Sequence, residues 1–348
     1  MPADTVSRTA VVARQRRVGL RVALAVAVGM TVGVGSGAVI PFLGPLFAAQ
    51  FLLGGARPLP VAKAIGTVGL ILLLGQFFIV MTGVFGSRPV QLLILLGMFF
   101  FLCFFLQASG KGGPAVFVSL VISVMVPLLD LLHGDLDQSM IMILFQGSAG
   151  GVALSWLAHA VLPEPAGEPD RPAQQPAPVA DPIARALANT LILLGAVTLC
   201  LTNSAFSSAI VIPITVASLL LQLDLAASAR ASVGLVAVNL LGGVLASLAF
   251  TFVDIRPSLL LLFLTTFLIG LLLGGRAATP LPIGKVYGGA LTTFLILFGT
   301  GLSPLPTSTP ESFSTRIVFV SLAVAYAVLA TALLWLREPV QRSLSSEG

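Results

Sequence analysis

Charged side chains are rare inside the apolar stretches of this chain, and one of them is an acid. Asp130 lies near the end of an apolar run, and three titratable residues follow it: His133, Asp135 and Asp137. A carboxyl group beside a histidine can take up and release protons. We predict that Asp130 and His133 couple proton movement. The alternative is that all four side chains face water at the end of the run.

Three basic side chains lie where apolar runs begin: Arg21, Lys63 and Arg230. A fixed cation can pair with a carboxylate, and the amino terminus of a nearby helix adds partial positive charge. We therefore predict that these residues bind an anionic substrate. The alternatives are headgroup contact or control of membrane orientation for Lys63 and Arg230, and a snorkelling side chain for Arg21.

Uncharged amides form a second polar set within the apolar runs: Gln50, Gln76, Gln107, Gln146, Asn189, Asn203 and Asn239. Gln76 follows Gly75, and Asn239 precedes Gly242 by three residues, in matching runs of the two halves of the chain. We predict that Gln76 and Asn239 bind substrate between the halves. Hydrogen bonding between helices is the alternative for all seven amides.

The composition determines which elements must position these side chains. Apolar residues make up 57% and charged residues 9% of the 348 residues, and the mean hydropathy is +1.06. A soluble domain of this size has too little interior to bury so much apolar surface. We expect an all-α polytopic membrane protein with about twelve transmembrane helices, because twelve runs are long enough, or nearly so, to cross a hydrocarbon core about 30 Å thick. The runs lie at about 18–35, 39–53, 62–84, 89–108, 113–132, 138–162, 183–202, 205–222, 227–252, 257–274, 281–302 and 315–337.

The second and eighth runs are the shortest, and both contain proline. Pro41 and Pro45 lie in the second run and Pro213 in the eighth. Proline removes a backbone donor and interrupts a helix. The pattern predicts a short, proline-broken second helix in each half and leaves open whether it crosses the membrane fully.

The chain contains an internal repeat. Residues 16–165 and 183–339 each hold six runs, and each block ends in Glu-Pro. Two basic pairs also match in order: Lys63-Ala64 with Arg230-Ala231, and Arg88-Pro89 with Arg256-Pro257. We expect two parallel six-helix repeats, joined by a Pro-rich cytoplasmic linker at 166–182 and flanked by cytoplasmic tails at 1–15 and 340–348.

The basic residues predict the orientation in the membrane. With a cytoplasmic amino terminus, fifteen of the eighteen Lys and Arg residues fall inside, and only Arg88, Arg256 and Arg316 fall outside. This asymmetry is typical of a bacterial inner-membrane protein with both termini in the cytoplasm. The basic start followed by an apolar run also resembles a signal peptide, but we expect an uncleaved first helix. The cations are scattered, which argues against nucleic acid as a partner.

Signatures of enzymes are missing from the sequence. It has no phosphate-binding glycine loop, no His-Glu-x-x-His and no nucleophile elbow. Cys103 and Cys200 lie within apolar runs without the spacing of metal ligands. We expect no enzymatic activity, no cofactor and no metal.

Several features of the first half together resemble one known family. They are a small-residue run after Arg21, a short run with prolines from Pro41 to Leu53, a basic turn at Lys63 to Gly66, and a fourth run rich in phenylalanine. This pattern resembles the six-helix membrane unit of the fusaric acid resistance and aromatic acid exporter superfamily, and plant malate channels are distantly similar. The resemblance covers almost the whole chain as two copies.

The resemblance implies export of aromatic or other organic acids across a bacterial inner membrane, often beside a periplasmic adaptor of the membrane fusion class. Of the family's functional residues, this resemblance implies counterparts only at Arg21 and Lys63, with Arg230 as the repeat equivalent of Lys63. Many relatives also have sizeable cytoplasmic domains. Here the linker at 166–182 and the tail at 340–348 are both short, so the regulation that such domains provide does not carry over.

We expect an efflux transporter for small organic anions, such as aromatic carboxylic acids or related drugs, driven by protons. The expected partners are membrane lipid and the anion, with a periplasmic adaptor and a second copy of the chain as candidate protein partners. One alternative is an anion channel. A second is a transporter like the major facilitators, although the turn Gly54 to Gly66 lacks the acid of their signature. A third is a permease subunit driven by a separate ATPase.

Overall fold

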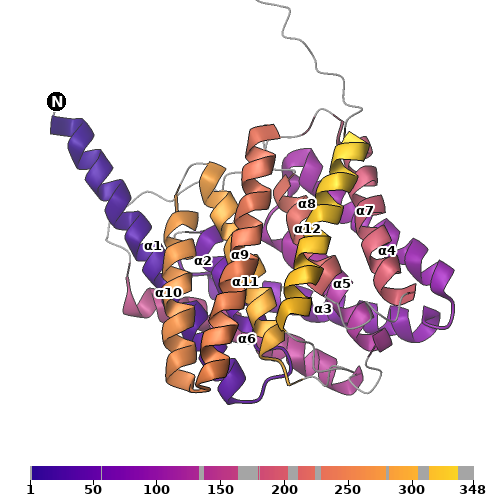
Figure 1. Ribbon diagram of the computed structural model, residues 1–348, viewed down its shortest axis with the longest axis horizontal. Coiled ribbons are helices and arrows are strands. Elements are labelled where there is room, and N and C mark those ends of the chain that lie inside the picture. The colour runs from indigo at the N-terminus through magenta and orange to yellow at the C-terminus, as the bar shows by residue number, and fades with distance from the viewer. Residues whose placement is uncertain are drawn as a thin grey trace, which may run out of the picture.

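The structure is a computed structural model that describes residues 2–55, 57–132, 137–163, 179, 181–202, 211–223, 229–279, 282–304 and 313–335. These residues form twelve α-helices and one π-helical turn, with no strand among them (Figure 1). The first six helices are α1 (Pro2–Gly35), α2 (Leu43–Gly54), α3 (Val61–Phe85), α4 (Pro89–Leu106), α5 (Pro114–Leu132) and α6 (Asp137–Val161), and the π-helical turn η1 (Gln107–Lys111) follows α4. The last six are α7 (Pro182–Thr202), α8 (Val211–Leu223), α9 (Ala229–Ile255), α10 (Leu259–Ala277), α11 (Pro282–Gly301) and α12 (Phe313–Trp335).

Each predicted apolar run corresponds to one of these helices. The largest difference is at the start, where α1 begins at Pro2 and includes the basic segment that we predicted to be a tail. The predicted linker at 166–182 lies almost entirely outside the described residues, and the predicted tail at 340–348 lies wholly outside them.

The all-helical membrane class is confirmed in its coarse form. Among the described residues, six helical segments are long and apolar enough to cross a membrane, namely Ala13–Gly35, Val61–Phe85, Pro89–Lys111, Ser139–Val161, Pro182–Thr202 and Leu259–Ala277. The described apolar parts of the other helices are shorter. Large aliphatic and aromatic side chains stand exposed along the outer helices, for example Leu73 and Phe77 on α3 and Leu248 and Phe252 on α9. Lipid is the solvent in which such surfaces are stable.

The short helices α2 and α8 have the lengths that the prolines predicted, but the prolines do not break them. Pro45 is the third residue of α2, and Pro213 is the third residue of α8. The first-turn amides of a helix have no intrahelical acceptor, so proline costs little there. At 12 and 13 residues, α2 and α8 are about 18 to 20 Å long, well short of the hydrocarbon core.

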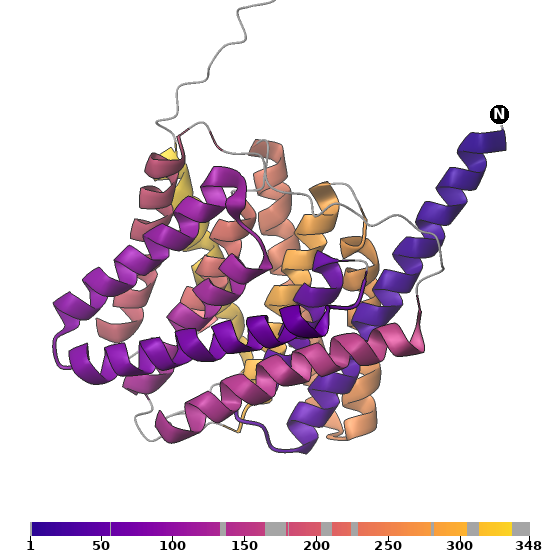
Figure 2. The same cartoon turned by 180° about the vertical axis from the view of Figure 1, so that it is seen from behind.

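Four helices form the centre of the bundle. Helix α2 contacts α5 and α11, and α8 contacts the same two helices. On one face of this centre α3 packs against α6, and on the opposite face α9 packs against α12 (Figures 1 and 2). At one end of the molecule α1 packs against α10, and at the other end α4 packs against α7 (Figure 1).

Glycines bring several helix backbones into direct contact. A Cβ added to Gly19 of α1 would lie 2.6 Å from the Cα of Gly275 in α10. A Cβ on Gly151 of α6 would lie 2.6 Å from the Cβ of Phe47 and 3.1 Å from the carbonyl oxygen of Gly44, both in α2. Because lipid removes the hydrophobic drive between helices, close packing of this kind must hold them together. Glycine therefore sets the distance between helices at these positions.

A pair of adjacent alanine substitutions tests this packing. Gly151→Ala should destabilise the protein by about 2 kcal/mol, because the added methyl group meets backbone atoms that cannot move aside easily. Gly150→Ala is the matched control, since nothing lies within 4 Å of its added Cβ. Thermal unfolding in detergent, followed by size-exclusion chromatography, measures both variants. Equal midpoints for the two would contradict the packing described.

Candidate functional site

Helices α2 and α11 lie antiparallel along their full lengths. The hydroxyl of Ser303, just after α11, donates to the carbonyl oxygen of Val39, just before α2, at 2.6 Å. Gly299 packs directly on the side chain of Phe42. Near the other end of α2, Gly288 packs beside Leu53. These contacts fix which residues of the two helices face each other.

One polar pair crosses this contact. The Nε2 atom of Gln50 donates to the hydroxyl oxygen of Thr292 at 3.1 Å, and the hydroxyl of Thr292 donates in turn to the carbonyl oxygen of Gly288 at 3.1 Å. Thr292 is buried, whereas Gln50 is only half-buried. The pair therefore offers an amide and a hydroxyl at a place that is otherwise apolar.

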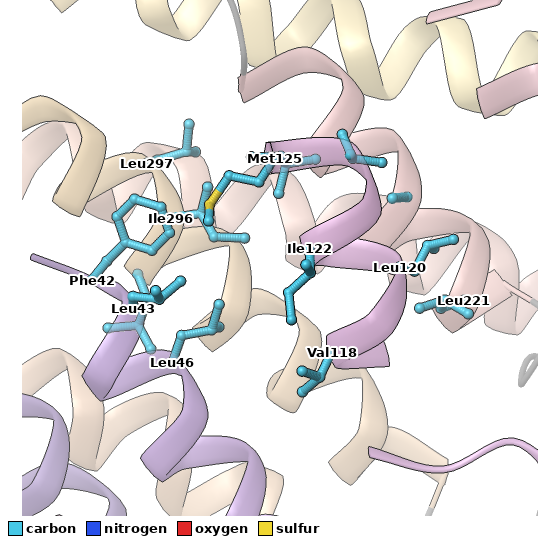
Figure 3. Close-up of a cluster of buried hydrophobic side chains, with 14 of the residues drawn as sticks. Phe42, Leu43, Leu46, Val118, Leu120, Ile122, Met125, Leu221, Ile296 and Leu297 are labelled. Carbon is cyan, nitrogen blue, oxygen red and sulfur yellow. The ribbon is translucent and has the colours of Figure 1, made fainter. Parts of the chain in front are cut away.

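Apolar side chains fill the rest of the central contact. Figure 3 shows Phe42, Leu43 and Leu46 from the start of α2, with Met125 of α5 reaching toward Ile296 of α11. Every one of them is buried. An aromatic or aliphatic molecule would meet a surface of matching polarity here, if the central helices moved apart.

The contact between α5 and α8 has the same character. Leu120 of α5 and Leu221 of α8 lie next to each other in Figure 3, and the two helices are in contact. One turn earlier in α8, Ser218 is fully buried, as is Val124 one turn further along α5. At these two places in the second contact, Ser218 and Val124 therefore offer no amide like that of Gln50.

Asp130 is held by a residue that the sequence analysis missed. The hydroxyl of Thr82 in α3 donates a hydrogen bond to the Oδ2 atom of Asp130 in α5. The same hydroxyl also lies 3.0 Å from the carbonyl oxygens of Phe78 and Ile79 in its own helix. A threonine in an apolar run carries no distinctive signal, so only the packing of α3 on α5 identifies Thr82. His133 lies outside the described residues.

Arg21 is fully buried and contacts backbone. Its exposed fraction is 1%, and its Nε atom donates to the carbonyl oxygen of Leu162 at 2.7 Å, just beyond the end of α6. A cation at the carboxyl end of a helix stabilises the carbonyl groups and the partial negative charge there. The geometry thus gives Arg21 a positioning contact between α1 and α6, whereas a substrate contact stays a prediction.

The other predicted binding residues do not come together with Arg21. Lys63 is exposed at the start of α3, and Gln76 is exposed further along the same helix. Arg230 and Asn239 belong to α9, but their side chains lie outside the described part of the structure. Substrate binding by these four residues therefore stays a prediction.

Basic residues gather at one end of the bundle, which we call the basic end. Arg21 begins the buried part of α1 and meets the end of α6, and the neighbouring Gly19 meets Gly275, next to Arg276. The indole nitrogen of Trp156 in α6 donates to the carbonyl oxygen of Leu59, between Arg57 and Lys63, at 2.9 Å. Four cations therefore lie on the same side of the molecule: Arg21, Arg57, Lys63 and Arg276.

A glutamine substitution tests the positioning role of Arg21. Arg21→Gln removes the charge-assisted hydrogen bond to Leu162 and should lower stability by about 2 kcal/mol. The exposed Arg16, five residues earlier in the same helix, provides the control variant Arg16→Gln, which should unfold like the unaltered protein. Thermal unfolding in detergent measures both. If Arg21→Gln unfolded at an unchanged temperature, the contact with α6 would be energetically unimportant.

Comparisons with known proteins leave the geometry as the sole basis for a functional assignment. Searches against protein-family models, curated proteins and solved structures found no match to this chain. Among the described residues, the functional proposal uses the Gln50–Thr292 pair, the Thr82–Asp130 pair and the basic end.

Proposed function

We propose that this chain is a bacterial inner-membrane transporter that exports small organic anions, such as aromatic carboxylates, in exchange for protons. We also propose that it is built like the membrane unit of the fusaric acid resistance and aromatic acid exporter superfamily, with about twelve membrane helices in two parallel repeats and both termini in the cytoplasm. The observation that carries the proposal is the matched packing of the two sets of six helices.

Each main helix contact in one half has a counterpart in the other. The contact of α1 with α6 matches that of α7 with α12, and α2 with α6 matches α8 with α12. The contact of α3 with α5 matches that of α9 with α11, and α3 with α6 matches α9 with α12. Contacts between the halves are also paired. The contact of α1 with α10 matches that of α7 with α4, and the contact of α2 with α11 matches that of α8 with α5. Two like-oriented repeats related by rotation would produce this pattern.

Individual residues support the same correspondence. Pro45 and Pro213 each lie third in their short helix. Leu53 and Leu221 are separated by the same number of residues as these two prolines. Leu120 and Gly288 have that separation too. Leu53 meets Gly288, and Leu221 lies beside Leu120. The two inter-repeat contacts therefore share one register.

The short helices point to a path between the repeats. Transporters built from repeats commonly bind substrate at the repeat interface, on short or interrupted helices in corresponding positions. Here α2 and α8 are the short helices, and both belong to the central four. A basic end beside this path would raise the local concentration of anions and so favours an anionic substrate.

Thr82 gives Asp130 a hydrogen bond in both of its protonation states. When Asp130 is ionised, it accepts from the Thr82 hydroxyl. When Asp130 is protonated, it can donate to Thr82, whose own proton can then go to the carbonyl oxygen of Phe78, 3.0 Å away. Proton uptake would thus reverse the hydrogen bond between α3 and α5 without leaving a polar group unpaired, as a proton-coupled step requires.

Transport by the purified protein tests the proposed function. In proteoliposomes we expect a pH gradient to drive movement of 4-hydroxybenzoate or phthalate, whose additional polar group slows passive leak. A deletion strain should accumulate these acids, and an overexpressing strain should exclude them. If none of a panel of aromatic and aliphatic acids moved faster than in protein-free vesicles, the proposal would be wrong.

An asparagine substitution separates a proton-driven exporter from an anion channel. Asp130→Asn cannot ionise, so proton-driven accumulation should fall to about the level of protein-free vesicles, while the protein stays folded. Asp254→Asn is the control, because Asp254 is an exposed carboxylate near the end of α9. Unchanged flux in Asp130→Asn would favour a channel, and a requirement for ATP would favour a permease subunit with a separate ATPase.

A further inference from the structure

We propose that Gln50 and Thr292 bind the carboxylate group of the transported anion, at the contact between α2 and α11. The proposal rests on the proposed function and names the groups that recognise the substrate. It replaces Gln76 by Gln50 as the amide that faces the path.

The hydrogen bonds of this pair can be exchanged with a ligand. Gln50 uses one N–H of Nε2 on the hydroxyl oxygen of Thr292, at 3.1 Å. A carboxylate oxygen is a stronger acceptor than a hydroxyl and can take the place of Thr292. The Thr292 hydroxyl can then turn from the carbonyl oxygen of Gly288 to the second carboxylate oxygen. After release, the pair re-forms, so neither state leaves a buried polar group unpaired.

The charge of the pair also suits transport. An amide and a hydroxyl are neutral donors, so they can bind an anion without holding it in a permanent ion pair. A site in a transport path must bind the substrate firmly enough for entry and weakly enough for release. The cations of the basic end would attract the anion, and the neutral pair would then receive it.

The surroundings of the pair match an amphipathic anion. Toward the start of α2 lie the apolar side chains of Phe42 and Leu46, which suit an aromatic ring. Toward the basic end lie Leu53 and Gly288, where a Cβ added to Gly288 would stand 3.7 Å from Leu53. Gln50 itself is half-buried. A carboxylate entering from the basic end would therefore reach Gln50 before its ring met the apolar centre.

The repeat does not duplicate this site. The sequence separation of Pro45 and Pro213 also relates Gln50 to Ser218 and Val124 to Thr292. Ser218 of α8 and Val124 of α5 are therefore the repeat counterparts of Gln50 and Thr292. Both are buried, and a serine opposite a valine offers no amide donor. One carboxylate should therefore bind per chain.

Matched leucine variants test the assignment. Gln50→Leu should raise KM for 4-hydroxybenzoate by about tenfold or more, since a hydrogen bond to a charged group is lost. Gln91→Leu makes the same change at an exposed position near the start of α4 and should leave KM within about twofold. Thr292→Val should behave like Gln50→Leu. An unchanged KM in Gln50→Leu, or an equal rise in Gln91→Leu, would overturn the assignment.

A labelling experiment keeps the test independent of turnover. Gln50→Cys should react with an anionic methanethiosulfonate reagent, and 4-hydroxybenzoate should slow that reaction, whereas it should not protect Gln91→Cys on the exposed face of α4. The native Cys103 and Cys200 are buried and serve as a low background. Labelling of Gln50→Cys that the substrate does not slow would overturn the site. An unaltered protein that transports no acid at all would instead refute the proposed function.

Discussion

The absence of water in the bilayer is the constraint from which the structure follows. Each peptide group must find a hydrogen-bond partner within the chain, so every described element is helical. Lipid also removes the hydrophobic drive between helices, which leaves close packing to join them. Gly19 against Gly275 and Gly151 against Phe47 show how small residues bring helices into direct contact. Most of the described side chains of the central helices are buried as a result.

Polar side chains obey the same constraint and fall into two groups. Most hydroxyls bond back to their own helix, as Thr190 does to the carbonyl oxygen of Ala186 and Thr266 to that of Leu262. These hydroxyls are hydrogen-bonded within their own helix and do not indicate which helix packs beside it. A few reach another part of the chain. Among them, Arg21 donates to the end of α6, Thr82 donates to Asp130, and Gln50 donates to Thr292. The last two pairs supply the proposed proton-coupling and carboxylate-binding groups.

The helices were readable from the sequence because a membrane span is a long apolar run, and twelve runs led to twelve helices. The sequence does not reveal which helices pack against each other. Helices α4 and α3 are apolar around their whole circumference, so no stripe indicates which face packs. For that reason the sequence does not distinguish the exposed Gln76 from the half-buried Gln50, and substrate binding by Gln76 stays a prediction. Substrate binding by Arg21 stays a prediction, and its contact with Leu162 could not be read from the sequence because it depends on a helix that ends far along the chain.

The packing of α1 against α10 has a consequence for synthesis. Eight other helices are made between the end of α1 at Gly35 and the start of its partner at Leu259. At ribosomal rates of about 5–20 residues per second, the first helix waits roughly 10 to 45 seconds in the membrane before α10 emerges. During that interval the surface of α1 around Gly19, Val22 and Ala23 is not yet covered by α10. Helix α4 waits for α7 over a far shorter stretch of chain. The two ends of the molecule are thus completed at different times, with the end that holds the amino terminus closing last.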